Sequence, residues 1–304
     1  MQLPAAAIDL GTNTARLLIG YREPSNRSIR PVVIKRWITR LGGNFTTEEG
    51  IAKEAQDRSV RALADFAEEI KKHGISRVRA VATSAVRDAV NGKSFCDEIF
   101  LKTGIRLEVI SGSEEGRLTL QGVLAGLDGN SGDLLVFDIG GGSTEYTLAL
   151  GGELIFTDSL PLGVVRLTEG KKNLESMAEK ISRELALLKA KLEREGFLKL
   201  FGDVTLVGTA GTATTLAAIS MKMGDYDYRK VNNYTLPLQE IRDIFATILP
   251  MTTGERQKVA GLEKGREDLI IAGILVTLKT METFGFSCLK VSDFGLLEGV
   301  LLNA

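Results

Sequence analysis

The sequence contains few of the residues that most often carry nucleophilic, redox or zinc chemistry. It has one histidine and two cysteines among 304 residues. His73 follows two lysines and precedes Gly74, so we interpret it as a helix end, which excludes a Ser-His triad, a phosphohistidine relay and a multi-histidine metal site. Cys96 and Cys288 show neither a disulfide framework nor a metal-ligand spacing. With these classes excluded, acid–base work falls to carboxylates.

Long apolar runs and an excess of one charge sign are also missing. The 38 basic and 39 acidic side chains give a net charge of −1, which offers no global attraction for nucleic acid or an acidic membrane. No apolar run approaches the length of a membrane span, and no basic segment precedes an apolar one at the N-terminus. We therefore expect a cytoplasmic protein without nucleic-acid or membrane partners, in which a local patch holds any polyanionic ligand.

The composition is that of an ordinary globular protein with room for two cores. Apolar residues make up 44% and charged residues 25% of the chain. Strand and helix patterns alternate in both halves, which predicts an α/β fold. We place one domain at residues 1–128 and the other at 129–292, and the last helix, at about 293–304, can pack back on the first domain.

One stretch, residues 134–145, combines a buried apolar run with a glycine turn and two carboxylates. Glycines let backbone N–H groups approach a bound anion, because no Cβ is in the way. Asp138 and Glu145 offer hard oxygen atoms, which suit a divalent cation and favour Mg²⁺ over zinc. A tight hairpin is the alternative interpretation. The phosphate contacts predicted here are Gly140, Gly141, Gly142 and Ser143.

Two further turns repeat the pattern of a strand followed by glycine and hydroxyl residues. The first follows Asp9 and contains Gly11, Thr12, Asn13 and Thr14. The second opens a helix, whose N-terminus attracts anions, and contains Gly208, Thr209, Gly211 and Thr212. A glycine-assisted turn without a ligand is again the alternative. Loops at corresponding places in two halves suggest a duplicated fold with a cleft between the halves.

Two predicted helices carry further charged residues of interest. A helix across residues 86–103 has Arg87 near its start. Another helix begins with Ser113 as its N-cap, and Glu114 and Glu115 lie in its first turn. Acidic side chains there are favoured by the helix dipole, so a structural role explains one of them well.

Seven stretches, in this order and spacing, resemble the Ppx/GppA family of exopolyphosphatases and guanosine pentaphosphate phosphohydrolases. They are residues 8–14, 82–87, 111–118, 137–145, 160–168, 208–212 and 292–301. The resemblance covers essentially the whole chain. It implies two ribonuclease-H-like domains of the actin-like ATPase superfamily with an interdomain cleft.

The resemblance also implies roles for individual residues. Glu115 matches the presumed catalytic base, Arg87 the phosphate-contacting arginine, and Asp138 and Glu145 the metal-associated carboxylates. Leu297 stands where the family usually has arginine. The resemblance predicts a short member of the family, without the C-terminal helical domain of the longer members.

These observations predict a Mg²⁺-dependent phosphohydrolase that releases terminal phosphate from polyphosphate or guanosine pentaphosphate with a water activated by glutamate. An ATP-dependent kinase of the same superfamily and a non-enzymatic sensor of guanosine tetraphosphate or pentaphosphate are the alternatives. Arg266 is a candidate for a phosphate or nucleotide contact, although a surface arginine at a helix start explains it equally. We expect a homodimer by analogy only, because no patch identifies an interface.

Overall fold

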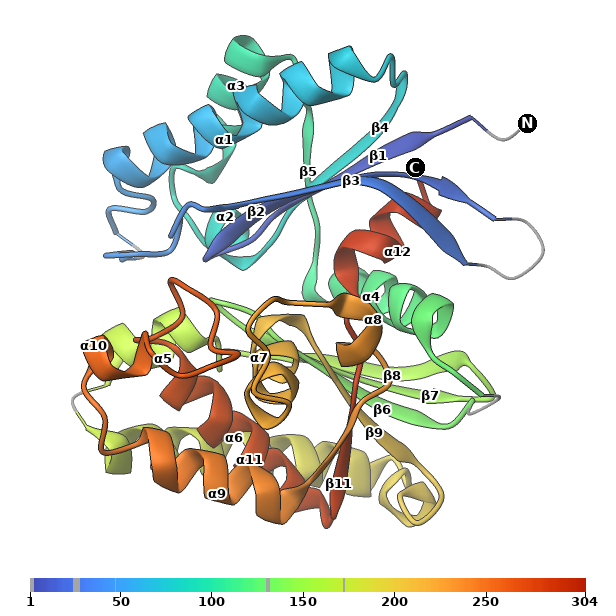
Figure 1. Ribbon diagram of the computed structural model, residues 1–304, viewed down its shortest axis with the longest axis vertical. Coiled ribbons are helices and arrows are strands. Elements are labelled where there is room, and N and C mark those ends of the chain that lie inside the picture. The colour runs from blue at the N-terminus through green and yellow to red at the C-terminus, as the bar shows by residue number, and fades with distance from the viewer. Residues whose placement is uncertain (1–2, 24–27, 47, 130–131, 172) are drawn as a thin grey trace. The chain divides into compact units, whose positions relative to one another are not determined.

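The computed structural model describes residues 3–23, 28–46, 48–129, 132–171 and 173–304 (Figure 1). The chain divides into two compact units. Unit 1 comprises Met1–Gly126 and Phe294–Ala304, and unit 2 comprises Leu127–Asp293. In the described part of the chain, no helix combines the length and the apolar character that crossing a membrane requires.

The sheet of unit 1 has five strands in the order β3-β2-β1-β4-β5, and only β2 runs antiparallel to the others. The strands are β1 (Ala5–Leu10), β2 (Thr14–Arg22), β3 (Ile29–Ile38), β4 (Arg77–Ala82) and β5 (Leu107–Val109). The helices are α1 (Lys53–Lys72), α2 (Ser84–Arg87), α3 (Gly92–Thr103), α4 (Gly112–Gly126) and α12 (Leu296–Leu302).

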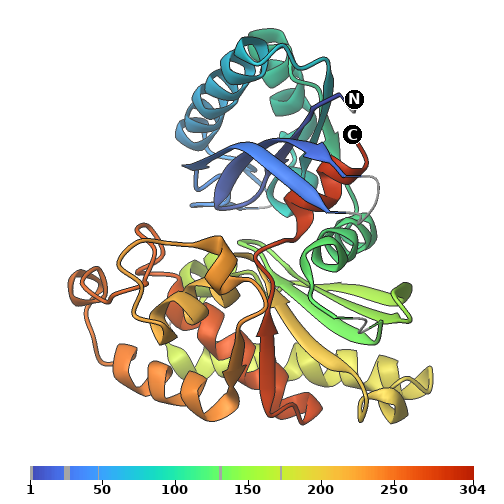
Figure 2. The ribbon, with the colours of Figure 1, turned by 45° about the vertical axis from the view of Figure 1, so that its right-hand side comes forward.

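Both faces of this sheet are covered, as the burial of β1 on both sides shows. Ala6, Ile8 and Leu10 point into the core beneath α1 and α3. Ala5 and Ala7, which alternate with them, point into a second core beneath α4 and α12 (Figure 2). The alternation places Asp9 on the α4 and α12 face of the sheet.

Helices α4 and α12 of unit 1 approach each other closely through two glycines. A Cβ at Gly122 would overlap the carbonyl of Gly295, and a Cβ at Gly299 would overlap that of Leu118. Leu297 is fully buried in the same core. An apolar side chain therefore suits the position where the family usually has arginine.

The sheet of unit 2 has six strands in the order β10-β11-β9-β6-β7-β8. The strands are β6 (Leu134–Ile139), β7 (Thr144–Leu150), β8 (Glu153–Leu160), β9 (Thr205–Thr209), β10 (Thr235–Pro237) and β11 (Cys288–Val291). The helices are α5 (Val164–Gly170), α6 (Leu174–Arg194), α7 (Ala210–Ser220), α8 (Tyr228–Val231), α9 (Leu238–Ile248), α10 (Thr253–Arg256) and α11 (Ile270–Phe284), with a 3-10 turn at Leu198–Leu200. Helices α6, α9 and α11 bury one face of the sheet in a single apolar core (Figure 1).

The two units repeat one topology. In each, the first three strands form an antiparallel meander, and two further strands add in parallel to the first strand. Unit 2 adds β10 at the edge, antiparallel to β11. This is the ribonuclease-H-like strand arrangement, so the predicted α/β fold with two such units is confirmed.

The helix predicted across residues 86–103 is wrong, because the structure divides it. Helix α2 ends at Arg87 and α3 begins at Gly92. The side chain of Asn91 accepts a hydrogen bond from the N–H of Ile51 and donates one to its carbonyl, both at 2.9 Å. This contact, distant in sequence, fixes the interruption. The predicted helix end at His73 is confirmed, since His73 is the C-cap of α1 and Gly74 follows with φ +64°.

Candidate active site

The glycine loop of unit 2 is a tight turn that α5 holds from one side. The N–H of Gly140 donates to the carbonyl of Ser143 at 3.0 Å and closes the turn. The first N–H groups of α5 bind the loop carbonyls: Val164 donates to Gly140 at 3.0 Å and Val165 to Gly141 at 2.9 Å. The unpaired N–H groups expected at a helix start are therefore used to fix this loop.

This bracing determines where the loop amides point. A peptide bond is planar and trans, so its N–H points away from its own carbonyl. Because α5 binds the carbonyls of Gly140 and Gly141, the N–H groups of Gly141 and Gly142 point away from α5. They are the donors that an anion can use. Gly163 is essential to the arrangement, since a Cβ there would overlap the backbone of Gly141 and Gly142.

Two buried carboxylates flank this loop on neighbouring strands. Asp138 on β6 lies directly opposite Glu145 on β7, so both side chains are on the same face of the sheet. They are 8% and 1% exposed. Ser159 on β8 is opposite Glu145 in turn. The hydroxyls of Ser143 and Ser159 both donate to Oε1 of Glu145, each at 2.7 Å.

The bond from Ser143 limits what this residue can offer a ligand. A hydroxyl has one proton, and that of Ser143 is donated to Glu145. It cannot be donated to a phosphate at the same time. The loop is therefore best described as a set of backbone donors beside a carboxylate that two hydroxyls orient.

The donor set suits Mg²⁺ better than a metal held only by protein. In the described residues, no three histidine, cysteine, aspartate or glutamate side chains converge as metal ligands. Asp138 and Glu145 are two hard oxygen donors on one face of a sheet. Mg²⁺ is typically held by one or two carboxylates together with waters and substrate phosphates. These two residues therefore fit a Mg²⁺ ion that would complete its shell with substrate.

The glycine loop of unit 1 has the same turn. The N–H of Gly11 donates to the carbonyl of Thr14 at 2.9 Å. The segment after β3 braces it: residues 39 and 40 both donate to the carbonyl of Asn13, and Gly42 donates to that of Thr12 at 2.9 Å. The segment that follows β3 therefore fixes the loop that contains the predicted phosphate contacts.

Further contacts fix this brace and the loop beneath it. The hydroxyl of Thr12 hydrogen-bonds that of Ser84 in α2, at 2.9 Å, and both residues are buried. Arg58 of α1 donates from Nε to the carbonyl of Thr39 at 2.8 Å. A Cβ at Gly42 would overlap the methyl group of Thr12.

Arg87 and Glu115, which come from α2 and α4, form an ion pair in unit 1. Nη1 of Arg87 lies 3.3 Å from Oε2 of Glu115 and donates to the carbonyl of Ile110 at 3.0 Å. The Glu115 residue is only 6% exposed. Sequence reasoning proposed both residues separately, and the structure brings them together.

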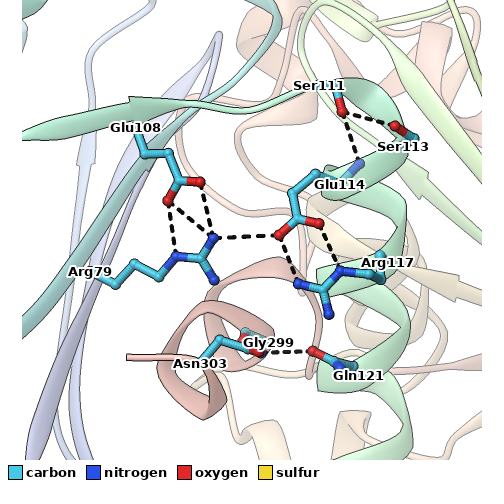
Figure 3. Close-up of polar contacts among 9 residues, drawn as sticks. All are labelled: Arg79, Glu108, Ser111, Ser113, Glu114, Arg117, Gln121, Gly299 and Asn303. Carbon is cyan, nitrogen blue, oxygen red and sulfur yellow. Dashed lines mark hydrogen bonds and ion pairs between the residues drawn. The ribbon is translucent and has the colours of Figure 1, made fainter.

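Glu114 has a different environment from the one its sequence suggested. The N-cap of α4 is Ser111, not Ser113, because Oγ of Ser111 accepts the N–H of Glu114 at 3.2 Å (Figure 3). Ser113 instead hydrogen-bonds Ser111. The hydroxyl of Ser111 precedes the first helical turn and so can reach an unpaired N–H group inside it.

The Glu114 side chain belongs to a four-residue ion-pair network. It binds Arg117 at 2.7 Å and Arg79 at 3.4 Å, and Arg79 also binds Glu108 (Figure 3). The hydrogen bond from Arg117, assisted by Arg79, lowers the pKa of Glu114. The network ties the first turn of α4, and with it Glu115, to strands β4 and β5.

The third loop combines unusual backbone with an arginine. Ala210, at the start of α7, has φ +60°, a left-handed conformation that is costly for a residue with a Cβ and that often marks ligand sites. The Arg266 guanidinium lies against Gly211, where a Cβ would overlap it, and Nε binds Glu263 at 2.5 Å. With its side chain 14% exposed, Arg266 covers the predicted loop instead of extending into solvent.

Predicted residues of the third loop differ in burial. Thr209 and Thr212 are 1% and 3% exposed, and Thr212 packs against Gly273 of α11. Gly208 belongs to β9 itself. Gly211 and the start of α7 are therefore the part of this loop that Arg266 approaches.

Sequence reasoning missed several residues that build these loops. Ser159, Gly163, Ser84 and the brace at residues 39–42 were not proposed as site residues. Ser159 could have been found by counting register across three predicted strands, because it lies opposite Glu145. The bracing segments share a second signal, since both directly follow the third strand of their meander.

Known proteins match this chain over nearly its whole length. The model of the Ppx/GppA phosphatase family matches residues 22–304. Exopolyphosphatase 2 of Mycobacterium tuberculosis is 34% identical, over 98% of this chain and 97% of that protein. A bifunctional 3-dehydroquinate synthase/phosphatase of Fusobacterium nucleatum is also 34% identical, but this chain spans only 46% of its length.

Solved structures give the same result. An exopolyphosphatase from Cytophaga hutchinsonii superposes with a TM-score of 0.88 at 27% identity, covering 99% of this chain and 98% of that one. The Ppx/GppA family member of Aquifex aeolicus gives a TM-score of 0.79 at 32% identity, covering 100% and 97%. The likeness therefore extends through both units.

Proposed function

This chain belongs to the Ppx/GppA phosphatase family, and on that premise we propose that it hydrolyses the terminal phosphoanhydride of inorganic polyphosphate. Guanosine pentaphosphate is the second substrate within the proposal. The observation that carries it is the unit 2 loop, where two backbone donors lie beside the buried pair Asp138 and Glu145. Donors for phosphate oxygens and ligands for a cation occur together there, as phosphoryl transfer requires.

The glycine loops hold phosphate groups in this proposal. The N–H groups of Gly141 and Gly142 point away from α5 and bind oxygens of the transferred phosphate. The loops at Gly11 and Gly211 are further phosphate sites in the proposal, and Arg266 adds positive charge at the second of these. Because the bracing segments fix these backbone donors, the donors can stabilise the negative charge that develops during transfer without having to reorganise.

Asp138 and Glu145 would hold Mg²⁺, and the bound ion would supply positive charge that neutralises the transferred group. Ser143 and Ser159 keep Glu145 oriented for this purpose. The same residues would bind other hard divalent cations, and Mg²⁺ is preferred because the ligands are few and all oxygen.

Glu115 acts as the general base. It removes a proton from the attacking water as the water oxygen bonds to the terminal phosphorus, and the bond to the bridging oxygen breaks. General-base action contributes roughly 10²- to 10⁴-fold to such rates. Arg87 orients Glu115 through the ion pair and contacts the phosphate with its remaining donors.

A phosphate-release panel tests the proposal. Polyphosphates of several lengths, guanosine pentaphosphate and ATP are each incubated with the chain, with Mg²⁺ and with a chelator. We expect release from polyphosphate with Mg²⁺ and none with chelator. Conversion of ATP to ADP only in the presence of a phosphate acceptor, with the phosphoryl group found on the acceptor and no free phosphate, would instead support an ATP-dependent kinase.

Three finer points belong to the same proposal. Binding of guanosine tetraphosphate without turnover of any substrate would identify a sensor, and calorimetry distinguishes it from an enzyme. A cytoplasmic location and a homodimer are likewise proposed. Fractionation of cells and the molar mass in solution test them.

A further inference from the structure

Ser143 and Ser159 form a hydroxyl clamp on Glu145. Both hydroxyls donate to the same atom, Oε1, each at 2.7 Å. One serine comes from the glycine loop and the other from β8, so the carboxylate is held from two directions. Glu145 is 1% exposed, which leaves little water to replace either bond.

We propose that this hydroxyl clamp makes Glu145 a one-oxygen ligand and thereby selects Mg²⁺ over Ca²⁺. The inference rests on the proposed function, because it assumes the cation site at Asp138 and Glu145. Ca²⁺ takes six to eight oxygen ligands and often binds a carboxylate through both oxygens, whereas Mg²⁺ demands near-octahedral geometry with fewer protein ligands.

The hydrogen-bond inventory explains the selection. A carboxylate oxygen accepts about two hydrogen bonds, and both are present at Oε1. A cation that bound through Oε1 would have to displace a serine hydroxyl. That hydroxyl would then be a buried donor without its acceptor, which is unfavourable. Binding through one oxygen avoids this loss.

Strand register makes the hydroxyl clamp rigid. Ser159 is directly opposite Glu145, which is directly opposite Asp138, across β8, β7 and β6. The central strand has a neighbour on each side, so Glu145 cannot shift without breaking the ladder. Ser159 is therefore a positioning residue that acts on the cation through Glu145.

Ser159→Ala tests the inference by cation binding, without substrate or turnover. Mn²⁺ binding to the full chain is followed by electron paramagnetic resonance, with Mg²⁺ and Ca²⁺ as competitors. Loss of a hydrogen bond to a metal ligand typically weakens metal affinity by about 10- to 100-fold. We expect Mg²⁺ affinity to fall by such a factor while Ca²⁺ affinity is kept or rises.

Two variants control for general disturbance of the strand. Thr157 is on the same strand and face, and its hydroxyl bonds that of Thr147 at 3.2 Å instead of touching Glu145. Thr157→Ala should leave the ratio of Mg²⁺ to Ca²⁺ affinity unchanged. Ser159→Thr keeps the hydroxyl and should restore the ratio. Circular dichroism of each variant checks that it is folded.

The measurements distinguish a failure of the hydroxyl clamp from a failure of the proposed cation site. An unchanged ratio of Mg²⁺ to Ca²⁺ affinity in Ser159→Ala, with Mn²⁺ still bound by the unsubstituted chain, overturns the hydroxyl clamp and leaves the proposed function standing. Equal loss of both affinities also overturns the selection. Absence of Mn²⁺ binding by the unsubstituted chain overturns the cation site itself and the inference with it.

Discussion

The two glycine loops lie at the same place in two copies of one topology, yet the rows of side chains beside them carry net charges of opposite sign. Both turns are closed by the same bond, from Gly11 to Thr14 and from Gly140 to Ser143. Each connects the first two strands of a meander. Both are braced by the segment that follows the third strand, at residues 39–42 in unit 1 and 163–166 in unit 2.

The difference appears in the row of residues across the three meander strands. These residues are Asp9, Arg16 and Arg36 in unit 1, and Asp138, Glu145 and Ser159 in unit 2. Both rows begin with an aspartate on the first strand. The second strand then carries arginine in one copy and glutamate in the other.

The comparison shows which part of the site the fold provides. The turn and its brace supply backbone donors in either unit. The residue on the second strand decides whether the surroundings suit a cation or an anion. Glu145 therefore suits unit 2 to the proposed Mg²⁺, and Arg16 gives unit 1 a positive charge that suits phosphate oxygens.

The largest expected effect separates two buried glutamates, Glu115 and Glu298, that follow the last strand of each sheet, β5 and β11. Glu115→Gln removes the proposed base, and turnover should fall roughly 10²- to 10⁴-fold with the fold unchanged by circular dichroism. Glu298 instead accepts the N–H of Gly295 at the start of α12, at 2.8 Å. Gln can accept the same bond, so Glu298→Gln should turn over polyphosphate nearly normally. Normal turnover by Glu115→Gln would remove the base from the mechanism.

The brace of unit 2 should tolerate an added methyl group less well than the brace of unit 1. In Gly163→Ala, the new methyl group meets the backbone of Gly141 and Gly142, which cannot move without moving the loop. Overpacking of this kind costs about 1–3 kcal/mol of unfolding free energy. Thermal denaturation and phosphate release should both decline. Retention of both would show that α5 does not hold the loop.

Substitution in the brace of unit 1 should cost less stability than in unit 2, and a second substitution should restore it. In Gly42→Ala, the methyl group overlaps the side-chain methyl of Thr12 and makes ordinary contacts with other atoms of that residue. We expect a loss of about 1 kcal/mol, at the lower end for overpacking. Thr12→Ser removes that methyl and keeps the hydroxyl bonded to Ser84. Combining the two substitutions should therefore restore the melting temperature, and no recovery would contradict the proposed contact.

The smallest effect concerns the ion-pair network at the start of α4. Arg117 lowers the pKa of Glu114 in the folded protein. The pair therefore stabilises the fold at pH values above the pKa that Glu114 has in the unfolded chain. This stabilisation is lost as pH falls through the lower pKa of Glu114 in the folded protein. Glu114→Gln should cost roughly 0.2–1 kcal/mol at pH 7, as for partly exposed pairs. The difference in melting temperature should close in acid. A difference that persists below the folded pKa of Glu114 would point to another cause.

Local patterns predicted much of the fold and of the loops. The meander strands and their turns follow from apolar runs that end at glycine, and both loop positions were predicted from them. Ser159 escaped notice because its bond to Glu145 depends on register across two hairpins. The interruption of the helix at residues 88–91 depends on Asn91 binding Ile51, which no local pattern reveals.

The pairing of Arg87 with Glu115 lies beyond local reasoning for the same reason. The two residues follow different strands, β4 and β5, and meet only because these strands pair in parallel. Parallel neighbours bring their carboxyl ends to one edge of the sheet. Topology, more than motif, therefore assembles this part of the site.

The most direct test of the cation assignment is the rate of phosphate release from polyphosphate as a function of Mg²⁺ concentration, for the unsubstituted chain and for Glu145→Gln. We expect the variant to need at least about 10-fold more Mg²⁺ for half-maximal rate, because a carboxylate ligand has been lost. Arg16→Gln, the change at the corresponding position of unit 1, should leave the Mg²⁺ requirement unchanged. Superimposable Mg²⁺ curves for the unsubstituted chain and Glu145→Gln would contradict the assignment of the cation to unit 2.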